Sequence, residues 1–151
     1  MNLNQLNILL AEDDQDDCMF FKTAIEEILP LTNLNVVNDG EELIKYLSEN
    51  EEQLPDVLFL DINMPRKNGI ECLSEIKRNK NLKDIPVVMF STSNSWDTIN
   101  LLFKIGAHVY IHKPSDFGQL KKVINNALPL AADNTLSNKP LKYILNAANC
   151  K

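Results

Sequence analysis

Five short runs of apolar residues recur along the chain, and an amphipathic stretch follows each of them. The runs cover residues 6–11, 34–37, 57–60, 85–90 and 109–111. In the stretches that follow, apolar residues recur every three or four positions, which is typical of a helix with one buried face. The central runs lack the alternating polar positions of a half-exposed antiparallel strand. The pattern therefore predicts buried strands that alternate with helices.

This alternation predicts an α/β fold with a doubly wound, five-stranded parallel sheet and helices on both faces. A closed eightfold barrel is excluded, because it needs about 250 residues and the chain has 151. Apolar spacing predicts that one helix begins near residue 16 and that Gly106 ends another. In the latter helix we expect Trp96, Ile99, Leu102 and Phe103 to point inward as packing residues.

The chain divides into a regular part, residues 5–128, and a C-terminal tail, residues 129–151. Pro129 is expected to end the regular part, because proline disrupts helical hydrogen bonding. In the tail, Leu141, Ile144 and Leu145 are spaced to form one apolar stripe of a short docking or dimerising helix. A loosely docked terminus is the other interpretation.

Composition narrows the classes of protein further. The formal charge is −6, from 15 basic and 21 acidic residues, which argues against broad binding to nucleic acid. The apolar runs are far shorter than the about 20 residues that span a bilayer, and the amino terminus lacks the pattern of a secretion signal. Cys18, Cys72 and Cys150 cannot all pair with one another. We therefore expect reduced thiols and a cytoplasmic location.

Polar residues follow four of the five predicted strands. In open α/β sheets, ligands bind beyond the carboxyl ends of the strands, so these residues should gather at one edge. Those that carry chemistry are Glu12 and Asp13 after the first run, Asp61 after the third, Ser91 after the fourth and Lys113 after the fifth. Asp14 or Asp16 is better explained as the cap of the next helix.

Three carboxylates in one partly buried cleft repel one another unless a cation joins them. Glu12, Asp13 and Asp61 are therefore predicted to hold Mg²⁺, which prefers carboxylates, waters and phosphate oxygens. A carboxylate such as Asp61 can also attack phosphorus as a nucleophile. In that case Lys113 and the cation would neutralise the phosphoryl oxygens, while Ser91 donates a hydrogen bond.

Four segments, in order, resemble the receiver domain of bacterial two-component response regulators. They cover residues 8–14, 60–69, 86–92 and 106–114, and the likeness extends over about residues 5–128. The resemblance implies the strand order 2-1-3-4-5. It also implies that Asp61 accepts a phosphoryl group from a histidine kinase or a histidine phosphotransfer protein. Such a protein is a switch and not an enzyme with a separate substrate.

The resemblance assigns roles to further residues. Asp13 resembles a direct Mg²⁺ ligand, Glu12 a ligand through water and the Asn63 main-chain carbonyl a third ligand. The bond between Lys113 and Pro114 is expected to be cis. Ser91 and Tyr110 resemble the switch pair, in which the aromatic ring rotates inward after the hydroxyl moves toward the phosphoryl group.

No DNA-binding module is predicted after residue 128, so we expect the output to be contact with a downstream protein, from a single-domain regulator or a homodimer. Two alternatives stay open. A phosphorylation-independent interaction module could retain the same pocket. A hydrolase of the haloacid-dehalogenase kind would need a second carboxylate two residues after Asp61, where this chain has Asn63. Gly-rich phosphate loops of nucleotide-binding proteins are absent from the sequence.

Overall fold

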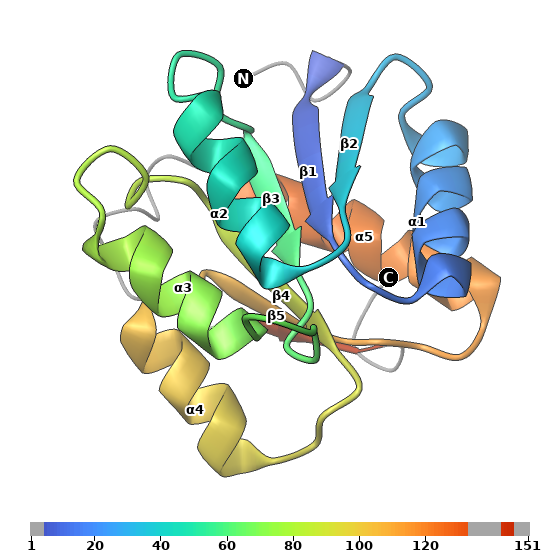
Figure 1. Ribbon diagram of the computed structural model, residues 1–151. Helices are drawn as coiled ribbons and strands as arrows, with labels where there is room; N and C mark the ends of the chain where they lie inside the picture. The colour runs from blue at the N-terminus through green and yellow to red at the C-terminus, as the bar shows by residue number, and fades with distance from the viewer. Residues whose placement is uncertain (1–4, 133–142, 147–151) are drawn as a thin grey trace.

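The architecture is a parallel β-sheet between two layers of helices (Figure 1). The structure, a computed structural model, describes residues 5–132 and 143–146. The sheet has six strands in the order β2-β1-β3-β4-β5-β6. In chain order they are β1 (Asn7–Ala11), β2 (Asn33–Val37), β3 (Val57–Leu60), β4 (Val87–Ser91), β5 (Val109–His112) and β6 (Tyr143–Leu145). The predicted doubly wound fold and the order 2-1-3-4-5 are confirmed, and β6 extends the sheet.

Five helices follow the first five strands. They are α1 (Gln15–Ile28), α2 (Gly40–Glu49), α3 (Gly69–Arg78), α4 (Trp96–Ile105) and α5 (Phe117–Ala132). Buried residues of α2, α3 and α4 pack on one face of the sheet, and those of α1 and α5 pack on the other. None of these helices in the described part of the chain is both long and apolar enough to cross a membrane.

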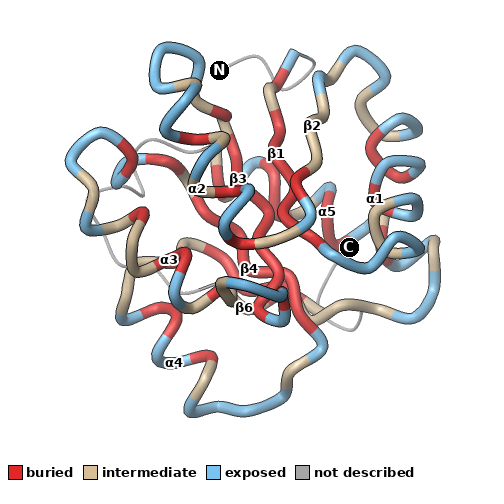
Figure 2. The backbone as a smooth tube through the Cα atoms, viewed as in Figure 1, coloured by how far each residue is buried: buried red, intermediate tan, exposed pale blue. Residues whose placement is uncertain are grey.

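Side chains of the strands contribute alternately to the two hydrophobic cores. In β1, Leu9 and Ala11 join the core under α2, α3 and α4, whereas Ile8 and Leu10 join the core under α1 and α5. Successive side chains of a strand point to opposite faces, so a strand covered on both sides must be apolar throughout. This is why the central runs carry no polar positions, and why the central strands β1, β3 and β4 are almost entirely buried (Figure 2).

Local signals determine where the helices begin and end. The side chains of Asp14, Asp39, Asn68 and Ser95 each accept a hydrogen bond from a backbone N–H in the first turn of the helix that follows. Such caps satisfy N–H groups that have no partner within the helix. Gly106 ends α4 with φ of 136°, a conformation that few residues other than glycine adopt. The predicted roles of Asp14 and Gly106 are confirmed.

The C-terminal tail differs from the sequence prediction. The short helix predicted there is wrong, because Ile144 and Leu145 lie in β6, which pairs in parallel with β5. Leu141 lies outside the described residues. An exposed edge of β5 offers unpaired backbone groups, and β6 satisfies them. Leu145 also packs into the core beside α5, which an isolated helix periodicity does not reveal.

Two further predictions are wrong. Pro129 does not end the regular part, because α5 continues through it to Ala132. Leu130 and Ala131 pack against the core, and this burial offsets the hydrogen bond that proline removes. Trp96 does not point inward, since it is 64% exposed at the start of α4. Ile99, Leu102 and Phe103 are buried as predicted.

Candidate functional site

The strand register brings the two central carboxylates to the same edge of the sheet. Ala11 of β1 pairs with Leu60 of β3, so the residues that follow, Glu12 and Asp61, leave the sheet side by side. The Asp61 N–H donates to the Ala11 carbonyl (3.1 Å), and the Glu12 N–H donates to Val37 (3.0 Å). Both acids are buried, with Glu12 0% and Asp61 5% exposed. These are the only acidic residues buried to this degree in the described part of the chain.

Asp13 completes a three-carboxylate cluster with Glu12 and Asp61. One oxygen of each residue lies within 4.8 Å of the other two, and Asp13 is the exposed member. Hard oxygen ligands at this spacing suit a divalent cation such as Mg²⁺. The chemistry of these residues therefore fits the predicted cation site. Within residues 5–132 and 143–146, no second group of acidic, histidine or cysteine residues is arranged in this way.

Side chains and backbone around the cluster fix the orientation of Glu12. Its Oε2 accepts from the Asp14 N–H (3.4 Å), and its main-chain carbonyl accepts from Asn38 Nδ2 (3.1 Å) and from the Cys18 thiol (3.3 Å). Cys18 is half-buried, and Cys72 lies in the core. Cys150 lies outside the described residues. The half-buried Cys18 thus serves the local structure of the acidic edge.

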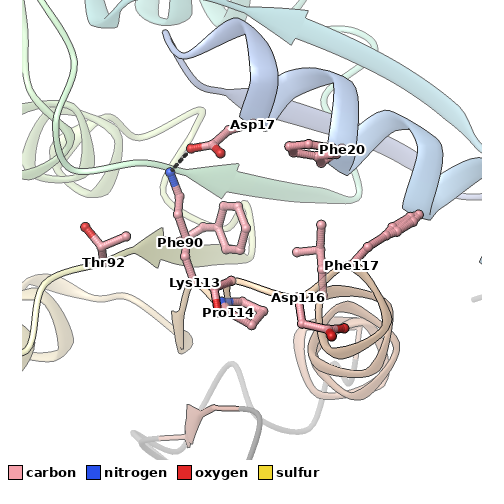
Figure 3. A pocket seen from close by; sticks show the side chains of 10 residues that line it. Asp17, Phe20, Phe90, Thr92, Lys113, Pro114, Asp116 and Phe117 are labelled. Carbon is pink, nitrogen blue, oxygen red and sulfur yellow. Dashed lines mark hydrogen bonds and ion pairs between the residues drawn. The ribbon is translucent and has the colours of Figure 1, made fainter.

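Lys113 reaches the acidic cluster from the end of β5. Its Nζ donates to Glu12 Oε1 (2.5 Å) and to Asp17 Oδ2 (3.0 Å), and it lies 3.7 Å from Asp61 Oδ2. The ammonium also lies 5.0 Å from the centre of the Phe90 ring, within the range of a cation–π contact. Figure 3 shows Lys113 extending toward Asp17 of α1 across this ring. The predicted convergence of Lys113 and Asp61 is therefore present in the geometry.

Burial and opposite charges act on the pKa values of this pair in competing directions. Burial raises the pKa of Glu12 to about 8, and the hydrogen-bonded Asp61 carboxyl adds to the rise, while Lys113 opposes it. Burial alone would lower the pKa of Lys113, but its contacts with Glu12 and Asp61 outweigh burial and raise the pKa. Lys113 is therefore held as an ammonium, and it partly compensates the acidic cluster.

Ser91 and Tyr110 lie next to this edge on neighbouring strands. Ser91 is fully buried, and its Oγ accepts from the Ser93 N–H (3.2 Å). The Tyr110 ring is 1% exposed, and its hydroxyl donates to the Ser93 carbonyl (2.6 Å). Burial raises the pKa of Tyr110. The Tyr110 ring is thus buried in this structure, and the predicted switch role of Ser91 and Tyr110 stays a prediction.

Sequence reasoning found most of the residues at this edge, but it missed Asp17. Asp17 lies in the first turn of α1 and contacts Lys113, which is 96 positions away along the chain. A signal for it existed, because Asp17 lies in the first turn of the helix that directly follows Glu12 and Asp13 along the chain. Asn63, two residues after Asp61, is exposed in the loop after β3. Its predicted role as a carbonyl ligand stays a prediction.

The peptide bond between Lys113 and Pro114 is trans, because the described residues contain no cis peptide bond. The expectation of a cis bond is therefore wrong for this structure. The trans form is also the intrinsically preferred one for a bond before proline. The Lys113 ammonium reaches Glu12 in this arrangement.

A cavity of about 350 Å³ lies between α1 and the start of α5, beside the lysine. Figure 3 shows Phe20 and Asp17 on one side of it and Pro114, Asp116 and Phe117 on the other. Because Lys113 and Phe90 also line it, the cavity connects the acidic edge to the surface formed by α1 and the β5–α5 loop.

The two histidines play no part in the acidic cluster. His108 Nδ1 accepts from the Val87 N–H (3.3 Å) at the opposite end of the sheet. His112 ends β5 and pairs in register with Ser91. Among the described residues, neither histidine belongs to a group of potential metal ligands.

Comparisons with known proteins agree with this geometry. Response regulator Rcp1 of Synechocystis sp. is 31% identical over 120 or so positions, covering 78% of this chain and 82% of Rcp1. The probable methanogenesis regulatory protein FilR2 of Methanothrix harundinacea is 33% identical, covering 78% of this chain and 77% of FilR2. Some relatives are longer: the chain covers 64% of the probable C4-dicarboxylate response regulator DctR of Bacillus subtilis.

Solved structures give the same result. The phosphorylated cyanobacterial phytochrome response regulator RcpA superposes with a TM-score of 0.75 and 32% identity, covering 82% of this chain and 91% of RcpA. The Mn²⁺-bound form of Rcp1 superposes with a TM-score of 0.75 and 28% identity, covering 85% and 96%. Residues 8–125 match the response regulator receiver domain as a family. This chain therefore belongs to the response regulator receiver domain family.

Proposed function

We propose that this protein is a signalling switch that accepts a phosphoryl group on Asp61 from a phosphohistidine of a histidine kinase or a histidine phosphotransfer protein. The observation that carries the proposal is the environment of one carboxylate, Asp61. Asp61 is buried, it lies in a cluster of potential cation ligands, and an ammonium is 3.7 Å from its Oδ2. This set matches what phosphoryl transfer requires.

In the proposed reaction, an Asp61 oxygen forms a bond to phosphorus as the bond between phosphorus and the imidazole nitrogen breaks. The leaving imidazole keeps the electron pair of that bond, and Asp61 becomes an acyl phosphate. Lys113 neutralises charge on the phosphoryl oxygens, and the Ser91 hydroxyl donates a hydrogen bond to one of them. The backbone bond from Asp61 to Ala11 holds the nucleophile at the end of β3.

Mg²⁺ is the proposed cofactor, held by Glu12, Asp13, Asp61 and the Asn63 main-chain carbonyl. When bound, it neutralises the developing charge on phosphorus-bound oxygens. The Mn²⁺-bound form of Rcp1, a relative with the same fold, supports a divalent cation in this family. A bound cation would oppose the rise in the pKa of Glu12 that burial and the neighbouring Asp61 cause.

The output is proposed to be a change at a protein-binding face, with no nucleic-acid or membrane partner. A dianion on Asp61 would attract Ser91 and Lys113, and this would alter the hydrogen bond between Tyr110 and Ser93. Tyr110 lies on β5 next to α4, so the change would reach that surface. We further propose a cytoplasmic, single-domain regulator that turns over no separate substrate, with homodimer formation as one means of output.

Intact-mass spectrometry with acetyl phosphate tests the proposal. Purified protein in Mg²⁺ should gain one phosphoryl group, and Asp61→Asn should gain none. Asp56→Asn is a matched control, because Asp56 lies at the opposite end of β3 and accepts from the Asn7 N–H. Absence of uptake by the wild type would contradict the proposal. If partner binding were also unchanged by Asp61→Ala, a phosphorylation-independent interaction module would be favoured.

A further inference from the structure

Lys113 has one carboxylate partner, Asp17, that the proposed chemistry does not use. Asp17 comes from the first turn of α1, and its Oδ2 lies 3.0 Å from the ammonium. Figure 3 shows the Asp17 carboxylate facing the end of the Lys113 side chain, with the hydrogen bond drawn between them. Its neighbour Asp16 is exposed in the same turn and makes no contact with Lys113. Asp17 is thus placed to restrain the lysine.

The three carboxylates around Lys113 differ in how easily each can release it. Glu12 is fully buried and 2.5 Å away, so its release would leave a desolvated carboxylate. Asp61 at 3.7 Å is beyond the range of a good hydrogen bond. The Asp17 side chain is 38% exposed, so water can replace the ammonium. Of these contacts, the one with Asp17 therefore costs the least free energy to break.

A phosphoryl group on Asp61 would compete directly for the same ammonium. It would add close to two negative charges and three acceptor oxygens next to a lysine already within 4 Å. An ammonium has only three donors, and Glu12 and Asp17 accept two of them. One donor is thus left for the phosphoryl group, and a second bond to its three oxygens requires release of the exposed partner, Asp17.

We propose that Asp17 is a positioning residue that restrains Lys113 in the unphosphorylated protein and releases it when Asp61 carries a phosphoryl group. This inference rests on the proposed function of Asp61. Because the contact exists in one state only, Asp17 stabilises the unphosphorylated state relative to the phosphorylated one. Loss of its carboxylate should therefore favour phosphorylation, in contrast to loss of a group that assists the transfer.

The test compares Asp17→Asn with two matched variants. Asp16→Asn makes the same change of charge one residue earlier in the same helical turn, without the contact to Lys113. Asp17→Glu keeps the carboxylate on a longer side chain and should restore the wild-type behaviour. Two readouts are needed, one that depends on the Asp61 chemistry and one that does not.

The first readout is the rate at which acetic anhydride acylates Lys113 in metal-free protein, mapped by peptide mass. Asp17→Asn should raise this rate several-fold, and Asp16→Asn should not change it. Equal rates in the wild type and Asp17→Asn would overturn the restraint. This readout requires neither a cation nor a phosphoryl group.

The second readout is the affinity for beryllofluoride, a mimic of the phosphoryl group, in saturating Mg²⁺. Asp17→Asn should bind it about two- to fivefold more tightly, the effect expected of one partly exposed ion pair. Asp16→Asn and Asp17→Glu should stay near the wild type. Equal or weaker binding by Asp17→Asn would overturn the proposed release, whereas no binding by the wild type would overturn the proposed function and the release with it.

Discussion

Lys113 and Lys77 stand at opposite ends of the sheet and show how partners decide the state of a buried amine. Lys113, at the carboxyl ends of the strands, meets three carboxylates, and its pKa is raised. Lys77, on α3, donates to the carbonyls of Lys83 (2.9 Å) and Ile85 (2.8 Å), near the amino end of β4. Burial lowers the pKa of Lys77 to about 8, although the charge of Asp84 opposes it.

This difference shows that burial alone does not turn a lysine into part of a functional site. Carbonyl dipoles hold the Lys77 ammonium in place but do not compensate its charge, so it serves the local structure. Formal negative charges keep Lys113 protonated and aimed at Asp61. Only the second arrangement can stabilise charge on a phosphoryl group.

The largest expected effect separates the two lysines by function. Lys113→Gln should lower the rate of phosphoryl uptake from acetyl phosphate by about 100-fold, because one preorganised charge is lost at the reacting oxygens. Lys77→Gln should leave the rate within about twofold of the wild type, a bound set by its distance from the reaction. Time-resolved intact-mass spectrometry measures both. Comparable losses in the two variants would remove the functional distinction.

Acid should destabilise the protein through His108, which lies at the same end of the sheet as Lys77. Burial and the charge of Lys77 lower the pKa of His108 to about 4, from an ordinary 6.5. The unfolded chain then binds more protons between these values, so stability is present above pH 6.5 and is lost as the pH falls through about 4. The contribution is about 3 kcal/mol over that window.

Urea unfolding of the wild type and His108→Gln at pH 6.5 and pH 4 isolates this contribution. Glutamine keeps a side-chain acceptor for the Val87 N–H and does not titrate. The free energy of unfolding should fall further in the wild type than in the variant. Parallel losses in the two proteins would contradict the assigned pKa of His108.

Raising the pH above 8 should instead stabilise the protein, through Lys77. Its pKa of about 8 in the folded protein lies below the 10.5 of an ordinary lysine, so the unfolded chain holds more protons between these values. The free energy of unfolding should therefore rise with pH, by about 2 kcal/mol between pH 8 and pH 9.5. Lys77→Met should lack this rise, as shown by urea unfolding at both pH values. Lys113, whose pKa is raised, adds no such rise.

The smallest expected effect concerns Gly106, which packs on Lys77. A Cβ at Gly106 would lie 3.0 Å from Lys77 Cγ, and φ is 136°. Gly106→Ala should lower the free energy of unfolding by about 1 kcal/mol, chiefly through backbone strain. The same substitution made in a Lys77→Ala variant removes the contact with Lys77, so thermal unfolding of that pair measures the loss due to backbone strain alone. If Gly106→Ala caused no loss of stability in that variant, crowding against Lys77 and not strain would be the cause.

Periodicity and residue type were sufficient to predict the layers of this protein and the chemistry of one edge of its sheet. Short apolar runs that alternate with amphipathic stretches indicate strands covered on both faces, and parallel strands place the residues that follow them together. Glu12, Asp61 and Lys113 could therefore be brought together from their positions after three runs. These inferences depend on local periodicity and on a general rule of parallel sheets.

The partner that each of these side chains takes depends on contacts between distant segments of the folded chain. The contact between Asp17 and Lys113, the pairing of β6 with β5, and the contacts of Lys77 with loop carbonyls join segments whose separation no short pattern encodes. The outward position of Trp96 and the passage of α5 through Pro129 likewise depend on what packs beside them. Periodicity identifies the face that is buried, whereas side-chain partners and pKa values follow from distances that exist only in the folded chain.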